Sequence, residues 1–75
     1  MGRNTTKVRN QIRKLRLLSG EMTQQQLADR IGVTRQTVNA IEGGKYSPSL
    51  EVAFRIAQAF GKPLQEVFEY KADRR

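Results

Sequence analysis

The chain has 75 residues, and its 14 Lys and Arg outnumber 7 Asp and Glu, which gives a formal net charge of +7. It contains no cysteine and no histidine, which excludes disulfides, thiolate nucleophiles and the usual zinc ligands. No apolar run approaches the roughly 18 residues that span a bilayer. We therefore expect a cytoplasmic protein without cofactor, metal or membrane contact, whose positive charge suits a polyanionic partner.

A single domain is expected over 1–75, because a chain of this length buries only a small core. Its ordered part should cover about 7–69, between a flexible basic N-terminus at 1–6 and a tail at 70–75. Residues 1–20 contain six basic residues and no acidic one. This charge can form either a solvated surface or one that contacts phosphates.

The first predicted element is a helix over about 7–18. Its apolar residues Val8, Ile12 and Leu15 recur at the spacing of one helical face. Ser19-Gly20 follows the last of them and supplies a typical helix end. The pattern therefore predicts an amphipathic helix that packs on the core through this stripe.

A second helix is predicted over about 24–31. Thr23 and Gln26 have the spacing of a capping box, in which each side chain bonds the backbone N–H of the other residue. Gly32 follows, and glycine readily adopts the left-handed conformation that ends helices. The sequence therefore defines both ends of this helix.

A third helix is predicted over about 35–42, with Thr34 as its N-cap and Gly43-Gly44 after it. The link to the preceding helix is short and holds one glycine, which is typical of a helix-turn-helix. Burial of Val38 and Ile41 would turn the polar side chains of this helix outward.

Two more helices are predicted after this motif. The first is capped by Ser49 or Ser47 and ended by Gly61. Its expected buried face consists of Leu50, Ala53, Ile56, Ala57 and Phe60. A last short helix after Pro63 should bury Leu64, Val67 and Phe68. The fold class predicted from these elements is all-α, with five helices.

The motif and its surroundings resemble the Cro/C1 (XRE) family of phage repressors over about Val8 to Phe68. The resemblance rests on Leu15, Arg16, Thr23, Gln24, Leu27, Ala28, Ile31, Gly32, Val33, Thr34, Val38, Ile41, Glu42, Gly44, Lys45, Pro48, Ser49, Leu50 and Ala57. It implies a compact repressor-like domain that binds double-stranded DNA as a homodimer. In this architecture the N-terminal end of the second helix of the motif enters the major groove.

Arg35 and Gln36 are the main candidates for reading bases. Arginine can donate two hydrogen bonds to guanine, and glutamine can pair with adenine. Arg35 could instead bind a phosphate. Thr37 and Asn39 are further candidates but are also ordinary helix residues, and Ala40 would leave room for a thymine methyl group or for water.

The candidates for phosphate binding lie at helix starts, in a loop and near the N-terminus. The resemblance implies a phosphate contact for Gln24, the first residue of its helix, where unpaired backbone N–H groups attract anions. The others are Thr34, Lys45, Tyr46, Arg3, Lys7 and Arg9. Each could also be a solvated surface residue.

Two sets of residues are expected to hold the structure and the dimer together. Arg16 lies one step from the apolar stripe of its helix, and the resemblance implies an internal ion pair with Glu42. The dimer interface is expected near the C-terminus, although its apolar residues could equally be core. These residues are Leu64, Val67, Phe68 and Tyr70.

The resulting hypothesis is a sequence-specific transcription regulator, a repressor that binds a near-palindromic operator. The alternative is a protein-interaction adaptor or antitoxin with the same fold, although an interface of that kind is usually richer in aromatic residues. An enzyme is not supported, because no His, Cys or paired carboxylates are present for acid-base or nucleophilic chemistry. No pocket for a small-molecule effector is evident.

Overall fold

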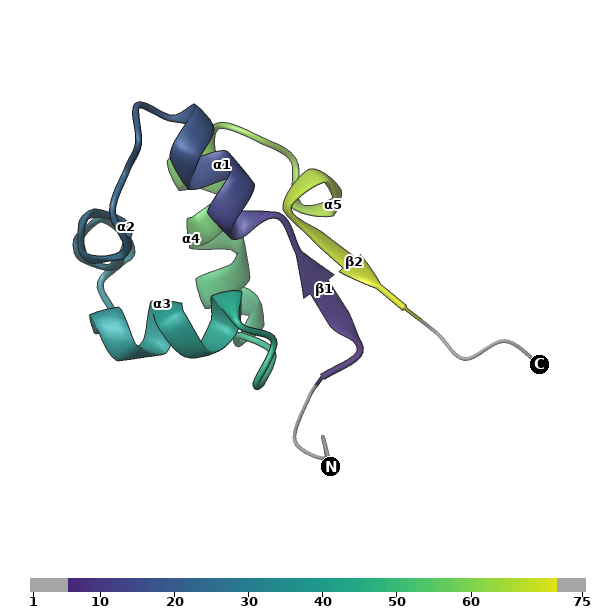
Figure 1. The fold of residues 1–75 in the computed structure, drawn as a ribbon. Helices are drawn as coiled ribbons and strands as arrows, with labels where there is room; N and C mark the ends of the chain where they lie inside the picture. The colour runs from purple at the N-terminus through teal and green to yellow at the C-terminus, as the bar shows by residue number, and fades with distance from the viewer. Residues whose placement is uncertain (1–5, 72–75) are drawn as a thin grey trace.

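The computed structural model describes residues 6–71, and five helices surround a small core in it (Figure 1). The elements in chain order are β1 (Val8–Asn10), α1 (Ile12–Leu18), α2 (Gln24–Ile31), α3 (Arg35–Glu42), α4 (Leu50–Phe60), α5 (Leu64–Val67) and β2 (Phe68–Tyr70). The two strands pair and project beyond the helices on the right of Figure 1. The prediction of an all-α fold was therefore wrong in part.

The small sheet replaces helix at both ends of the domain. β1 and β2 are antiparallel, with Val8 opposite Tyr70 and Asn10 opposite Phe68. The first helix was predicted to begin near residue 7, but it begins at Ile12, and Phe68 belongs to β2 rather than to the last helix. A strand of three residues is stabilised mainly by pairing with another strand. Here the two paired strands lie about 60 residues apart in the sequence, so local periodicity could not reveal either strand.

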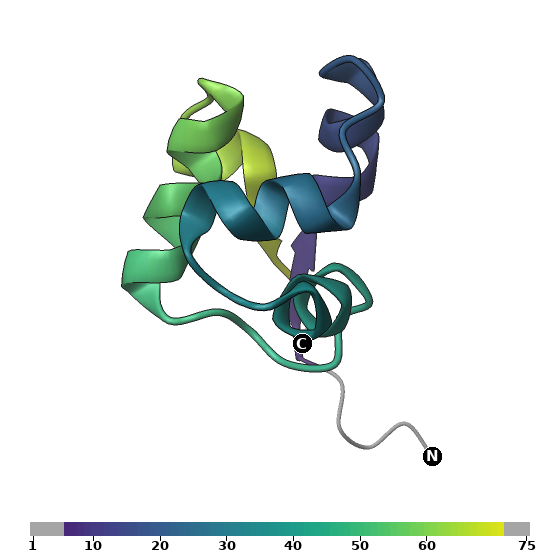
Figure 2. The same ribbon diagram turned by 90° about the vertical axis from the view of Figure 1, so that its left-hand side faces the viewer.

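The helix-turn-helix has the predicted bounds. The Thr23 hydroxyl accepts a hydrogen bond from the Gln26 N–H at 3.0 Å, and the Gln26 side chain accepts one from the Thr23 N–H at 2.8 Å. Gly32 ends α2 with a φ of 76°, in the left-handed region that favours glycine. The Thr34 hydroxyl accepts from the Thr37 N–H at 3.1 Å and caps α3. Figure 2 shows the result: α2 lies lengthwise across the view, and α3 is seen nearly end-on below it.

The core is one apolar cluster to which every helix contributes. Its largest fully buried side chains are Ile12, Leu27, Val38, Ile41, Ile56 and Val67. Leu50 was predicted to be buried but is 67% exposed as the first residue of α4, whereas Ala53, Ile56 and Ala57 of the same predicted face are buried. Among residues 6–71, no helix is long and apolar enough to cross a membrane.

Leu27→Ala should lower the free energy of unfolding by about 2–5 kcal/mol, because it leaves a cavity where a fully buried side chain packs. Leu18→Ala is the matched control, since Leu18 is 72% exposed and its loss should change stability by at most about 0.5 kcal/mol. Urea denaturation followed by circular dichroism measures both. Equal midpoints for the two variants would contradict this core.

Candidate nucleic-acid interface

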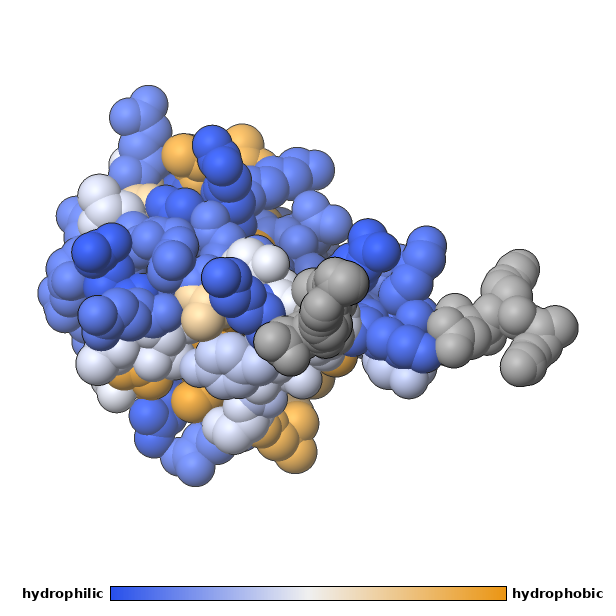
Figure 3. Space-filling model, turned by 60° about the horizontal axis from the view of Figure 1, so that its bottom comes forward, coloured by the Kyte–Doolittle hydropathy of each residue, from blue (hydrophilic) through white to orange (hydrophobic). Residues whose placement is uncertain are grey.

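The rotation of α3 about its own axis is set by its two buried residues. Val38 is 1% exposed and Ile41 is 2% exposed. Residues on the opposite side must therefore face outward. Figure 3 brings the lower side of Figure 1, where α3 lies, toward the viewer: hydrophilic residues cover most of this face, and hydrophobic ones appear mainly at its margins.

The five candidate base-reading residues all lie on α3 but differ in exposure. Arg35, Gln36 and Asn39 are exposed, whereas Thr37 and Ala40 are half-buried. The Thr37 hydroxyl lies 3.0 Å from that of Thr34, so the two hydroxyl groups form one hydrogen-bonded unit at the helix start. The exposed side chains can therefore reach furthest from the protein surface.

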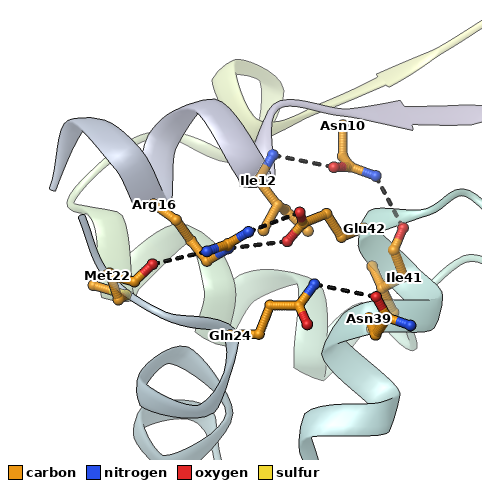
Figure 4. Close-up of polar contacts among 8 residues, drawn as sticks. All are labelled: Asn10, Ile12, Arg16, Met22, Gln24, Asn39, Ile41 and Glu42. Atoms are coloured by element: carbon orange, nitrogen blue, oxygen red, sulfur yellow. Dashed lines mark hydrogen bonds and ion pairs between the residues drawn. The ribbon is translucent and has the colours of Figure 1, made fainter.

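Gln24 and Asn39 are joined across the two helices of the motif. The Gln24 Nε2 donates a hydrogen bond to the Asn39 Oδ1 at 3.2 Å (Figure 4). Gln24 is the first residue of α2, and Asn39 lies in the middle of α3. The bond therefore connects a candidate phosphate-binding residue with a candidate base-reading residue.

Arg16 connects three parts of the domain. Its Nε donates to Glu42 Oε1 at 3.0 Å and its Nη2 to Glu42 Oε2 at 2.9 Å, which joins α1 to the end of α3. Its Nη1 also donates to the Met22 carbonyl oxygen at 2.8 Å, in the loop before α2. The Arg16 and Glu42 side chains are only 11% and 12% exposed. Both charges are thus largely removed from water and compensate each other.

Asn10 is a structural residue of this region that the sequence analysis missed. Its Nδ2 donates to the Ile41 carbonyl oxygen at 3.0 Å, and its Oδ1 accepts from the Ile12 N–H at 3.0 Å (Figure 4). It therefore bonds the first N–H of α1 from the residue before the N-cap Gln11, and it holds the end of α3. An asparagine two residues before a buried isoleucine could have suggested this bond, because asparagine side chains readily bond the backbone N–H two residues further on.

The segment before β1 is tied to the loop that follows α3. The Thr6 N–H donates to the Gly44 carbonyl oxygen at 3.2 Å, and the hydroxyl groups of Thr6 and Ser47 lie 3.3 Å apart. Lys45 and Tyr46 are exposed in this loop. The start of the described chain and the loop after α3 therefore form one edge of the candidate interface.

The basic residues expected near the N-terminus are only partly covered by the structure. Lys7 and Arg9 are exposed, and both lie on the β1 side of this edge. Arg3 lies outside the described residues. Two other bases on α1, Arg13 and Lys14, are exposed and line a groove together with Gln24 and Asn39. The sequence analysis counted their charge but did not place them at the site.

One residue of the expected dimer interface cannot contact a partner. Val67 is 0% exposed and belongs to the core, so its assignment to the interface was wrong. It is the last residue of α5 and packs in the core cluster with Ile12 and Ile56, and β2 begins at the next residue. Leu64 and Phe68 are half-buried against the core, whereas Tyr70 is 67% exposed.

Comparison with known proteins identifies the family. A sequence profile of the helix-turn-helix family matches residues 12–67. The chain belongs to this family, in its Cro/C1 (XRE) branch. An uncharacterized HTH-type transcriptional regulator of Methanocaldococcus jannaschii is 46% identical over 66 residues, which cover 88% of this chain and 98% of that protein.

Two further similarities extend the comparison. The cryptic phage CTXphi transcriptional repressor RstR of Vibrio cholerae is 36% identical over 58 residues, or 77% of this chain and 51% of that one. PlcR of Bacillus thuringiensis, solved with the peptide PapR7 and DNA, superposes with a TM-score of 0.64 at 36% identity over 71% of this chain and 18% of PlcR. The fold around α2 and α3 is therefore shared with a protein solved on DNA.

Glu42→Ala should lower the free energy of unfolding by roughly 3–5 kcal/mol, because it leaves the buried Arg16 charge without its partner. Glu51→Ala is the matched control: Glu51 pairs with Arg55 at 2.7 Å, but these side chains are 75% and 47% exposed. Its loss should cost about 1 kcal/mol or less. Chemical denaturation compares the two variants, and an unchanged midpoint for Glu42→Ala would refute a structural role for the pair.

Proposed function

We propose that this protein is a sequence-specific transcription regulator that binds a near-palindromic operator as a homodimer and represses transcription. The observation that carries the proposal is the orientation of α3 on the core. Val38 and Ile41 are buried while Arg35 and Gln36 are exposed at its first turn. Helix-turn-helix proteins insert this end of the corresponding helix into the major groove, and the relatives named as transcriptional regulators support the same role.

Arg35 and Gln36 supply the sequence information in this proposal. A guanidinium can donate to O6 and N7 of guanine, and a glutamine amide can pair with N6 and N7 of adenine. Each such contact contributes about 1–3 kcal/mol of discrimination between bases. Thr37 and Ala40, half-buried beside them, would offer methyl groups to thymine rather than polar contacts.

Phosphate contacts fix the position of α3 along the duplex. Gln24 and Thr34 lie at the starts of α2 and α3, where backbone N–H groups favour an anion. Lys45 and Tyr46 are exposed in the loop at the other end of α3. Phosphates bound at both ends of the helix would hold it in the groove, with Lys7 and Arg9 adding contacts from β1.

A homodimer is part of the proposal, because one domain offers few contacts and a two-fold pair reads two half-sites one helical turn apart, about 34 Å. The surface that best suits a second copy is an apolar groove. It is lined by Val8, Ser47, Pro48, Leu50, Ala53, Leu64 and Phe68, with Tyr70 opposite Val8 on the sheet. None of these side chains is charged, so two chains of net charge +7 that meet there would bring no like charges of this set together.

The operator can be found by selecting bound sequences from a random pool of double-stranded DNA. We expect a near-palindrome whose base preference relaxes at one base pair per half-site in Arg35→Ala, because a bidentate guanine contact is lost. Arg30→Ala is the control, since Arg30 lies at the end of α2 and bonds the Ala59 carbonyl oxygen. A pool without consensus, or an identical consensus for Arg35→Ala, would contradict the assignment.

Dimerisation can be tested with Leu50→Gln, which should weaken the dimer about tenfold or more, because the 67% exposed leucine would lose burial against a second copy. Leu18→Gln alters a comparably exposed leucine, 72%, on α1 and should leave the dimer unchanged. Sedimentation equilibrium measures both. If Leu18→Gln rather than Leu50→Gln weakened the dimer, the interface would lie on α1 instead.

A further inference from the structure

We propose that the groove between α1 and α3 is a binding site for DNA backbone phosphates, in which Arg13 and Lys14 supply the charge and Gln24 supplies a hydrogen-bond donor. In this site Asn39 is a positioning residue that holds Gln24, not a reader of bases. The inference rests on the proposed function and assigns a role to α1, which the helix-turn-helix itself does not include. The groove is lined chiefly by Arg13, Lys14, Leu17, Gln24, Asn39 and Gly43.

The charge of the groove favours an anion. Arg13 and Lys14 are exposed on its α1 side. Of the residues that line it, all within 6–71, Glu42 is the one acid. Both of its carboxylate oxygens accept hydrogen bonds from Arg16, at 3.0 and 2.9 Å. The ion pair therefore cancels the negative charge and leaves two cations facing the groove.

The position of the groove suits a DNA strand beside α3. Its α2 and α3 sides are formed by Gln24 and Asn39, which face each other below the ion pair in Figure 4. Asn39 is on the exposed side of α3, the same side as Gln36. A duplex that receives the first turn of α3 in its major groove would therefore bring a flanking strand of phosphates against α1.

Gln24 is held ready to donate to such a phosphate. A glutamine amide has two N–H donors, and one of them bonds the Asn39 Oδ1 at 3.2 Å. The second donor remains for an anion. The bond to Asn39 restricts the half-buried side chain, so less conformational entropy is lost when a phosphate binds. The bond to Asn39 therefore makes phosphate binding by Gln24 more favourable.

The same bond argues against base reading by Asn39. Bidentate recognition of adenine requires the asparagine oxygen to accept from N6 while its amide nitrogen donates to N7. In this structure one lone pair of the Oδ1 accepts from Gln24, so base reading would require the same amide to meet the geometry of two partners at once. Asn39 should consequently affect the strength of binding to all DNA sequences rather than the choice among them.

The charge contribution can be measured through the salt dependence of operator binding for Arg13→Ala, Lys14→Ala and the double variant. Each phosphate neutralised contributes about −0.9 to the slope of log affinity against log salt. We expect the slope to become shallower by about one for each single variant and about two for the double variant, with equal weakening on operator and scrambled DNA. Lys62→Ala is the control, because Lys62 is exposed in the segment between α4 and α5 and lines none of this groove. That segment lies at the top of Figure 1, away from α3, so the slope should equal that of the wild type.

The role of Asn39 can be separated from that of Arg35 by repeating the sequence selection with each alanine variant. Asn39→Ala should weaken binding but return the wild-type consensus, whereas Arg35→Ala should change it. Thermal melting by circular dichroism should show that these exposed substitutions leave the fold intact. An altered consensus for Asn39→Ala would overturn its positioning role.

Failure of this inference differs from failure of the proposed function. If the wild-type protein bound no DNA at low salt, both would be overturned. If it selected an operator but the double variant of Arg13 and Lys14 kept the wild-type salt slope, only the groove proposal would be overturned. A slope reduced as much by Lys62→Ala as by Arg13→Ala would likewise overturn it, because the effect would then reflect net charge alone.

Discussion

The orientation of α3 depends on the burial of Val38 and Ile41, and the candidate interface depends on that orientation. These two side chains are 1% and 2% exposed, and burial of each contributes about 1.5–3 kcal/mol. Successive residues of a helix differ in direction by about 100°, so the burial of two positions determines where all the others point. Arg35, Gln36 and Asn39 are exposed for this reason.

Polar contacts then fix α3 against its neighbours. Arg16 reaches Glu42 from α1, Asn10 reaches the Ile41 carbonyl oxygen from β1, and Gln24 reaches Asn39 from α2. Desolvation offsets much of the attraction in a buried ion pair, so the net gain in stability from the pair of Arg16 and Glu42 is smaller than the cost of removing one partner. Together these contacts hold α3 rigidly on a small core, and recognition of DNA requires a rigid helix.

The predictions from sequence succeeded where the signal was local. The capping box of Thr23 and the N-cap of Thr34 predicted the bounds of α2 and α3, because the bonds involved connect residues three apart. The predictions failed where the deciding contact was distant. Val8 has helical spacing to Ile12 but pairs with Tyr70, and Val67 was assigned to an interface although it is buried in the core.

The sequence by itself determined the helix-turn-helix, its phase and its outward residues, since caps and periodicity act within a few residues. Arg13 and Lys14 show what it could not determine: their charge is visible in the sequence, but their place beside Gln24 follows from how α1 packs against α2 and α3. The sheet and the bond between Gln24 and Asn39 could not be determined from the sequence for the same reason. Such contacts join residues that are distant in the chain, and only the packing of the whole domain brings them together.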